Sequence, residues 1–198
     1  WHLYPKLKSV AVLTSRGCPN RCTYCATYLL NKKFVQRRSE DVISEIISTY
    51  NQFNVENFAF YDDALFAHRD RHIIPILKGI ISAGVKINLH SPNGLFAREI
   101  NSELAELMFS AGFKTVRLSL ESTSSQIQKS SSNKVNNANY TDAVNNLAKA
   151  GFARNSLETY LIMGLPGQTR QQIIDSINFV ADQGVIVKLA SFSPIPGT

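Results

Sequence analysis

Apolar and polar positions alternate with two different periods along this chain. Short runs rich in β-branched and aromatic residues have the pattern of strands buried between two layers. These runs cover residues 10–15, 58–62, 85–90, 116–121, 157–163 and 185–192. Between them, amphipathic segments predict helices at 40–52, 70–83, 102–111, 141–150 and 170–183. Strands and helices therefore follow one another as repeated βα units.

Glycines and helix caps mark the joints between these units. A glycine stands between a predicted helix and a β-branched or aromatic residue at Gly84, Gly112, Gly151 and Gly184. A glycine in this place adopts the left-handed conformation that ends a helix. Ser39 is expected to cap the first helix, and Thr169 with Gln172 to form a capping box on the last one.

Six strands and five intervening helices predict an α/β fold, a partial TIM-type (β/α)6 barrel with parallel strands. A full eight-unit barrel needs about 250 residues, and this chain has 198. We expect a single domain, residues 1–198, truncated at both ends from a longer chain. The first strand starts almost at residue 9, and the last unit stops at the Pro-Ile-Pro-Gly-Thr sequence of 194–198.

Composition limits the class of protein. A hydrophobic content of 44% and a charged content of 18% are those of a globular protein. No apolar run approaches the roughly 20 residues of a membrane span, and the first residues have no signal-peptide pattern, so we expect a cytoplasmic protein. In that reducing compartment, clustered cysteines indicate metal binding or catalysis.

The chain carries a net charge of +6. Such an excess attracts an anionic substrate or RNA. Part of it lies in Lys32, Lys33, Arg37 and Arg38, without the interleaved aromatic residues of nucleic-acid motifs. A solvated basic face is therefore the favoured interpretation, and RNA stays an open but less favoured partner.

The three cysteines of the chain, Cys18, Cys22 and Cys25, fall within eight residues as C-x-x-x-C-x-x-C. Iron–sulfur clusters with a full protein shell take four cysteines, so three leave one iron open to an outside ligand. An open metal position is typical of chemistry rather than of a structural role. The alternative is a structural zinc site completed by His68 or His90, which the missing second ligand pair disfavours.

Polar residues gather where the predicted strands end, and the first strand runs into the cysteines. In parallel βα folds, functional groups collect at these carboxyl ends. On the fourth strand Arg117, Ser119 and Glu121 share one face by period-two alternation, and the apolar residues between them should meet the helices. Glu158 on the next strand is placed to neutralise Arg117, and whether this pair serves packing alone stays open. Glu121 lies at the strand mouth, where a ligand contact is favoured.

Residues 16–25, Arg-Gly-Cys-Pro-Asn-Arg-Cys-Thr-Tyr-Cys, follow the first strand and resemble the cysteine motif of the radical S-adenosylmethionine (radical SAM) superfamily. The resemblance extends over essentially the whole chain. Gly-Leu-Pro-Gly-Gln-Thr at 164–169 and Pro-Ile-Pro-Gly-Thr at 194–198 are further sequences that such enzymes carry. Phe-Tyr-Asp-Asp at 60–63 and Asn-Gly-Leu at 93–95 resemble the branch in which a cobalamin-binding domain often precedes the radical domain.

This resemblance implies that Cys18, Cys22 and Cys25 bind a [4Fe–4S] cluster, with S-adenosylmethionine on its open iron. One electron, from a flavodoxin- or ferredoxin-type donor, would cleave the sulfonium C–S bond. The products would be methionine and a 5′-deoxyadenosyl radical, which takes hydrogen from a small-molecule or anionic substrate. The reaction would be methylation, rearrangement or ring formation, and cobalamin would lie on a domain outside this chain.

The resemblance also implies a set of cofactor-binding residues. They are Tyr24, Asp62, Asp63, Ser119, Glu121, Gly164 and Ser191. Asp62 and Asp63 stand where many members have Gly-Gly-Glu, so at least one would bind the methionine amine, and which one is open. Glu121 would bind the ribose hydroxyls, and Gly164 would let backbone approach the nucleoside. Tyr24 and the end of the sixth strand, near Ser191, would contact adenine.

Two alternatives stay open. One is a non-catalytic iron–sulfur binding or electron-transfer module without S-adenosylmethionine. The other is methylthio transfer to tRNA, which the basic charge encourages. Methylthio transfer normally needs a second cluster with three cysteines of its own, which this chain lacks, although those cysteines could lie outside it. The residues do not identify the substrate.

Overall fold

The strands form one parallel sheet whose order follows the chain. The computed structural model describes residues 7–131 and 134–197. Hydrogen-bonded neighbours run in the order β1 (Ser9–Val12), β4 (Asn57–Phe60), β5 (Asn88–His90), β7 (Phe113–Glu121), β8 (Leu157–Met163) and β9 (Ile186–Ser191), and every pair is parallel. A short strand, β6 (Leu95–Phe96), pairs with β7 beside this path. The predicted partial TIM-type barrel is confirmed.

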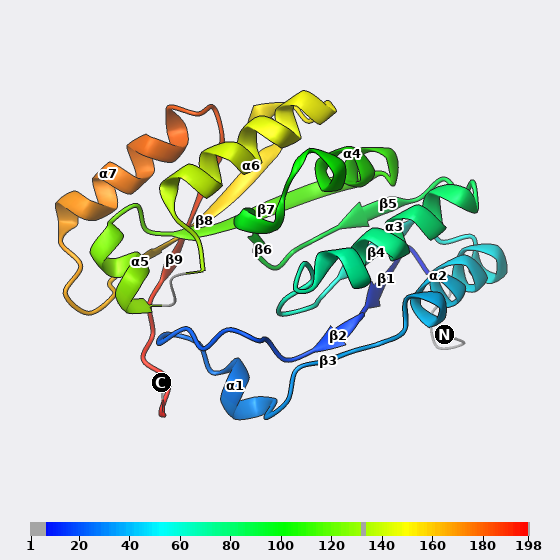
Figure 1. The fold of residues 1–198 in the computed structure, drawn as a ribbon, viewed down its shortest axis with the longest axis horizontal. Helices are drawn as coiled ribbons and strands as arrows, with labels where there is room; N and C mark the ends of the chain where they lie inside the picture. The colour runs from blue at the N-terminus through cyan, green and yellow to red at the C-terminus, as the bar shows by residue number, and fades with distance from the viewer. Residues whose placement is uncertain (1–6, 132–133, 198) are drawn as a thin grey trace.

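The main helices cover one side of the sheet and form the outer arc of Figure 1. They are α2 (Ser39–Phe53), α3 (Ile73–Ser82), α4 (Ser102–Ser110), α6 (Asn137–Ala150) and α7 (Arg170–Ala181). All predicted strands and helices are therefore confirmed, with ends that differ by a few residues. Among the described residues, no helix is long and apolar enough to cross a membrane.

Several short elements were not expected from the sequence. They are the helices α1 (Thr27–Leu30) and α5 (Ser125–Ser131), single 3-10 turns at Arg69–Arg71, Ala97–Glu99 and Arg154–Ser156, and the antiparallel ribbon of β2 (Ser15–Arg16) and β3 (Val35–Gln36). The ribbon begins and ends the loop that contains the cysteines. Because this loop follows β1, it lies at the same edge of the sheet as the loops that follow the other parallel strands.

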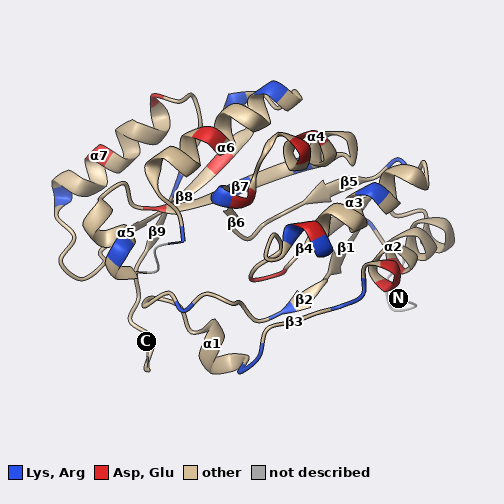
Figure 2. Cartoon of the chain, in the orientation of Figure 1, with Lys and Arg blue, Asp and Glu red and all other residues tan. Residues whose placement is uncertain are grey.

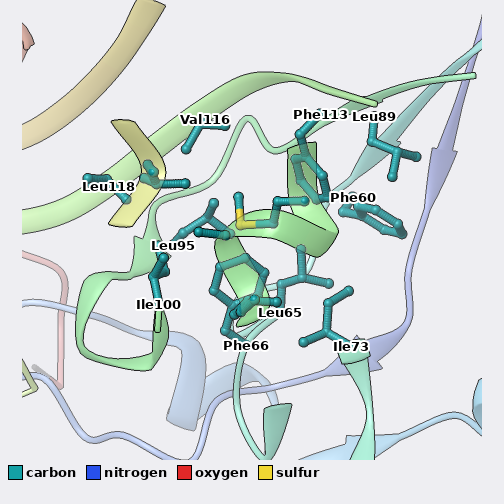
Figure 3. Packing of buried hydrophobic residues seen from close by; sticks show 14 of the residues in the cluster. Phe60, Leu65, Phe66, Ile73, Leu89, Leu95, Ile100, Phe113, Val116 and Leu118 are labelled. Atoms are coloured by element: carbon teal, nitrogen blue, oxygen red, sulfur yellow. The ribbon is translucent and has the colours of Figure 1, made fainter. Parts of the chain in front are cut away.

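The core lies between the sheet and the helices (Figure 3). Phe60 of β4 stacks on Phe113 of β7, with ring centroids 6.1 Å apart. Val116 and Leu118 are buried, as the alternation on β7 predicts for the side that meets the helices. Arg117 between them points to the opposite side of the sheet, which we call the inner face.

Basic residues are distributed over the molecule. Figure 2 shows Lys and Arg on α3, α5, α6 and α7 as well as along the segment around β2 and β3, with acidic residues between them. Arg37 and Arg38 of that segment pair with acidic residues of α2, which are Glu45, Glu40 and Asp41. The part of the excess charge that follows the cysteine loop is thus partly neutralised by its own neighbours.

The helix caps correct one expectation. The Thr169–Gln172 capping box at the start of α7 is confirmed. Ser39 is not a cap, because α2 begins at Ser39 and its N-cap residue is Arg38, which has extended backbone and no side-chain bond to the helix. The Ser39 hydroxyl instead donates to the carbonyl of His72 at the start of α3. Tertiary contact between two helices has replaced the local cap.

Two of the helix-ending glycines offer a matched test of backbone strain. Gly84 and Gly112 both have positive φ, +66° and +89°. A Cβ at Gly112 would lie 2.4 Å from the carbonyl oxygen of Ile87, whereas a Cβ at Gly84 would meet nothing within 4 Å. We expect Gly84→Ala to cost about 1 kcal/mol of unfolding free energy from conformation alone. Gly112→Ala should cost at least about 1 kcal/mol more, because backbone must move. Equal urea midpoints for the two variants would contradict this.

Candidate functional site

The three cysteines line one cavity of about 260 Å³ at the carboxyl edge of the sheet. We call it the cysteine cavity. Cys22 is buried, Cys18 and Cys25 are partly exposed, and none is in a disulfide. Burial raises the pKa of the Cys18 thiol, although a backbone hydrogen bond from Asn20 acts in the opposite direction. The three cysteines thus line one common cavity.

The arrangement does not suit a single zinc ion. Within the described residues, no three His, Cys, Asp or Glu side chains lie close enough together to hold one metal ion. His90 bonds instead to Thr115 and Asn57, and His68 stacks on Phe34. Ligands of a cluster are spread around a body of several irons and need not converge on a point. Neither histidine lines the cysteine cavity, so the zinc site considered from the sequence lacks its fourth ligand.

Asp62 and Asp63 have different surroundings. Asp62 is 3% exposed, and its carboxylate accepts hydrogen bonds from the Thr14 amide (3.1 Å), the Thr14 hydroxyl (2.7 Å) and the Ser15 hydroxyl. Asp63 lines the cysteine cavity. Burial raises the pKa of Asp63 and the neighbouring Asp62 carboxylate adds to this, against a backbone hydrogen bond from Gly17. Of the two, Asp63 is the carboxylate that faces the cysteines.

Lys134 and Thr27 line the cysteine cavity although the sequence did not indicate them, and Lys134 is the charged one. Its ammonium pairs with Glu121 at 2.7 Å, and the two side chains are only 8% and 12% exposed. It lies 5.7 Å from the ring centroids of both Tyr24 and Phe96 and also lines the cysteine cavity. Burial lowers the pKa of Lys134, but the nearby Glu121 and Cys22 raise it by more than this. The pKa of Lys134 is therefore above its ordinary value. A cation is thus held at the wall of the cavity.

Glu121 lies behind the wall of the cysteine cavity, next to the lining residues Lys134 and Tyr24. It ends β7 with φ at +69°, at the point where the register between β7 and β8 shifts. A non-glycine residue in this conformation is strained, and such strain is concentrated at functional sites. Glu121 itself is not among the residues that line the cavity.

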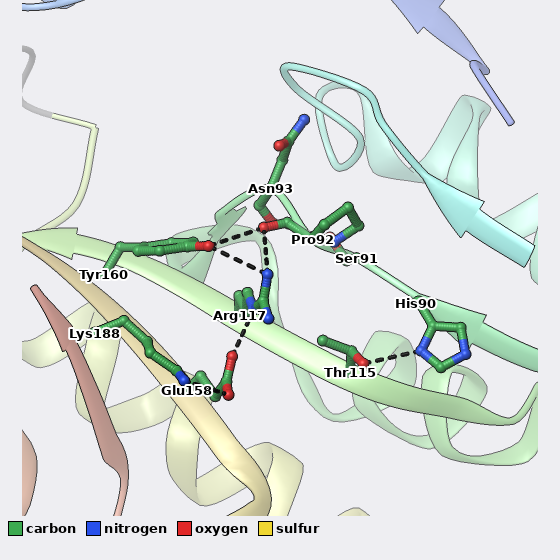
Figure 4. Close-up of polar contacts among 9 residues, drawn as sticks. All are labelled: His90, Ser91, Pro92, Asn93, Thr115, Arg117, Glu158, Tyr160 and Lys188. Atoms are coloured by element: carbon green, nitrogen blue, oxygen red, sulfur yellow. Dashed lines mark hydrogen bonds and ion pairs between the residues drawn. The ribbon is translucent and has the colours of Figure 1, made fainter. Parts of the chain in front are cut away.

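The loop after β5 contributes Asn93 and Gly94 to the wall of the cysteine cavity, and Figure 4 shows how this loop is held. The Pro92 carbonyl accepts hydrogen bonds from Arg117 Nη1 (3.2 Å) and the Tyr160 hydroxyl (3.1 Å). Asn93 Nδ2 donates to the carbonyls of Tyr61 and Asp62. The loop is therefore fixed both to the sheet and to the neighbouring loop.

Gly94 of this loop packs closely against Ser119 of β7. Both line the cysteine cavity, and a Cβ at Gly94 would lie 2.0 Å from the Ser119 hydroxyl. A side chain at this position would force the Ser119 hydroxyl to move, so glycine permits the close approach. The Asn-Gly-Leu sequence at 93–95 was a signal for this wall in the sequence.

A second cavity, of about 530 Å³, adjoins the first through Tyr24. Its walls are mainly apolar and include Ile127, Leu165, Pro166 and Phe192. The predicted residues Gly164 and Ser191 do not line it, but each directly precedes a residue that does. Their cofactor contacts stay predictions.

The Tyr24 hydroxyl is buried and has no hydrogen-bond partner among the residues that the structure describes. Burial raises the pKa of Tyr24 and the nearby Glu121 carboxylate raises it further, so the phenol is a neutral donor. An unpaired buried donor between two cavities is a place where a polar ligand atom would be stabilised.

Residues 12–180 match the family model described as the radical SAM superfamily. The chain belongs to this superfamily. An uncharacterised methyltransferase of Pyrococcus horikoshii is 27% identical over 189 residues, 94% of this chain and 40% of that protein. The tRNA-2-methylthio-N(6)-dimethylallyladenosine synthase of Tropheryma whipplei is 25% identical over 207 residues, 96% of this chain and 42% of that protein. The chain spans about two fifths of the length of these relatives.

A solved radical SAM structure shares the fold. The methyltransferase TsrM from Kitasatospora setae, with cobalamin and a [4Fe–4S] cluster bound, matches with a TM-score of 0.80 at 16% identity. The match covers 91% of this chain and 36% of TsrM. Radical SAM enzymes use a [4Fe–4S] cluster and S-adenosylmethionine. Three thiols in one cavity, next to an unpaired buried phenol and a second cavity, fit this pair of groups.

The different surroundings of the two aspartates give a test by stability. Asp62→Asn should lower the unfolding free energy by about 3 kcal/mol, because an amide cannot accept all the hydrogen bonds that reach the buried carboxylate. Asp63→Asn changes the same charge one residue away and should cost less than about 1 kcal/mol. Urea unfolding of both variants measures the difference. A larger loss for Asp63→Asn would contradict the division between them.

His72 makes this network sensitive to pH. Its Nε2 lies 2.8 Å from the Thr14 hydroxyl, which donates to Asp62, so the ring N–H donates to that oxygen. Burial lowers the pKa of His72, so the unfolded chain takes up its proton first as the pH falls. Stability should therefore decrease below about pH 6.5, until the folded pKa is passed. Burial lowers the pKa of His90 as well, so a His72→Gln variant should keep part of the slope. An unchanged slope in His72→Gln would contradict the assignment.

Proposed function

We propose that this chain is the radical SAM domain of an enzyme that uses S-adenosylmethionine to modify a small organic substrate, with methylation the favoured reaction. The observation that carries the proposal is the cysteine cavity, where three thiols, the Asp63 carboxylate and the Lys134 ammonium line one chamber. The methyltransferase among the relatives favours methylation over rearrangement or ring formation. The cobalamin of TsrM supports a cobalamin-binding domain outside this chain.

Each part of the site has a role in this proposal. Cys18, Cys22 and Cys25 would hold the cluster and leave one iron open. The chemistry that the bound cluster supplies is the one-electron cleavage of the sulfonium C–S bond. Asp63 would bind the methionine amine, since the carboxylate of Asp62 is already taken by Thr14 and Ser15.

The remaining polar groups suit the rest of S-adenosylmethionine. Lys134 offers a cation for the methionine carboxylate at the cavity wall. Glu121 would accept ribose hydroxyls, and Tyr24 with the apolar second cavity would take the adenine. Gly164 and Ser191 would contribute at the rim of that cavity, and Ser119 at the floor of the first. The electron would come from a flavodoxin- or ferredoxin-type protein.

The test uses the chain reconstituted with iron and sulfide under anaerobic conditions. Adding S-adenosylmethionine should change the EPR spectrum of the reduced cluster, and incubation with reductant should release 5′-deoxyadenosine. Cys22→Ala should abolish both signals. Asp63→Asn should weaken binding of S-adenosylmethionine at least about tenfold, the cost of one lost charged hydrogen bond. Asp70→Asn, at a side chain that is 76% exposed, is the matched control.

The alternatives give different outcomes in the same experiment. A cluster whose EPR spectrum does not respond to S-adenosylmethionine would favour an electron-transfer module and would refute the proposal. Methylthio transfer to tRNA has a relative in its favour, the Tropheryma whipplei enzyme. Against it, the chain has cysteines for one cluster only. Product analysis separates the two, because methylthio transfer adds sulfur to its substrate and methylation does not.

A further inference from the structure

The inner face of the sheet carries charged side chains on three adjacent strands, β7, β8 and β9. On β7 and β8, Arg117 is the register partner of Glu158; on β8 and β9, Tyr160 is the register partner of Lys188. Neighbouring residues of the opposite parity, such as Leu118 and Leu161, are buried in the core. Alternation therefore places these four polar side chains together on the inner face. Figure 4 shows them grouped below the loop after β5.

Two cations in this group share one carboxylate. Glu158 pairs with Arg117 through Oε2 and with Lys188 through Oε1, the latter at 3.1 Å. Burial acts to raise the pKa of Glu158, but hydrogen bonds from Arg117 and Lys188 outweigh it and lower the pKa. His90, on the same face, is kept neutral near pH 7 because burial lowers its pKa. The group therefore carries one uncompensated positive charge.

A structural role accounts for only part of this arrangement. Arg117 Nη1 and the Tyr160 hydroxyl hold the Pro92 carbonyl, and Arg117 Nε pairs with Glu158. The Nη2 amino group of Arg117 donates to no residue that the structure describes. Lys188 takes no part in holding the loop, and its side chain is 43% exposed. Holding the loop needs only one cation, Arg117, paired with one carboxylate, Glu158. The second cation, Lys188, is therefore not explained by this structural role.

We propose that Lys188 and Arg117 form a subsite for an anionic group, a carboxylate or a phosphate, on the enzyme's organic substrate. The proposal rests on the function proposed above, and it takes the inner face beside the cysteine cavity as the place where the substrate would bind. Ser119, which lines that cavity, lies two residues beyond Arg117 on β7. Two residues of a strand span roughly 7 Å. The subsite therefore suits a substrate whose reacting carbon lies a few bonds from its anionic group.

Charge-changing variants of opposite sign test the subsite. The reconstituted chain is titrated with inorganic phosphate and, separately, with acetate at constant ionic strength, and amide NMR shifts on β8 and β9 are followed. Wild type should bind at least one of these anions saturably. Lys188→Gln should weaken binding about tenfold, and Glu158→Gln should tighten it several-fold, because each changes the local charge by one unit in opposite directions. Lys188→Arg keeps the charge and should keep the binding. The comparison of phosphate with acetate identifies which anion the subsite prefers.

Lys114→Gln is the matched control. It removes the same charge as Lys188→Gln, but from β7, at a position whose parity is opposite to that of Arg117 on the same strand. Equal weakening by Lys114→Gln and Lys188→Gln would show a general charge effect and overturn the subsite, as would weaker binding in Glu158→Gln. Unfolding midpoints confirm that each variant is folded. If the chain cleaves S-adenosylmethionine but binds neither anion, the subsite alone is refuted. If the chain binds an anion but does not cleave S-adenosylmethionine, the proposed function alone is refuted.

Discussion

The buried carboxylate of Asp62 is the interaction on which the site depends. Burying a charge costs several kcal/mol unless hydrogen bonds replace its water. Here the Thr14 amide, the Thr14 hydroxyl and the Ser15 hydroxyl supply them. Because Thr14 and Ser15 begin the cysteine loop and Asp62 follows β4, this one contact fixes where the loop leaves the sheet. The position of the cysteines relative to the other strand ends is thereby set.

The same contact gives the neighbouring carboxylates of Asp62 and Asp63 different surroundings. The carboxylate of Asp62 accepts hydrogen bonds from Thr14 and Ser15, whereas Asp63 lines the cysteine cavity. Two adjacent carboxylates would otherwise repel each other in the same chamber, as the raised pKa of Asp63 reflects in part. Lys134 balances the negative groups that face the cysteine cavity.

Period-two and helical patterns were sufficient to predict the sheet, its parallel order and the pairing of Arg117 with Glu158. The same alternation also indicates which of the two aspartates is buried, because Asp62 continues the pattern of the buried residues Phe58 and Phe60. Lys134 could not be predicted in this way. It follows α5 in a segment without periodic pattern, and its place depends on how two rings and the end of β7 meet in space. Ser39 was misassigned for a similar reason, because a contact with α3 outweighed a local cap.

The inner face shows why the open side of a partial barrel differs from a core. A fully buried face would favour apolar side chains, since a buried ion pair is often no more stable than a well-packed hydrophobic one. A face open to water throughout would gain little from fixing Arg117, Glu158 and Lys188 in one network. These side chains are instead partly exposed, at 28%, 19% and 43%. Charges held in partial burial, with one cation in excess, keep their interaction strong while leaving room for a further anion. That combination is what distinguishes a binding face from a packing face.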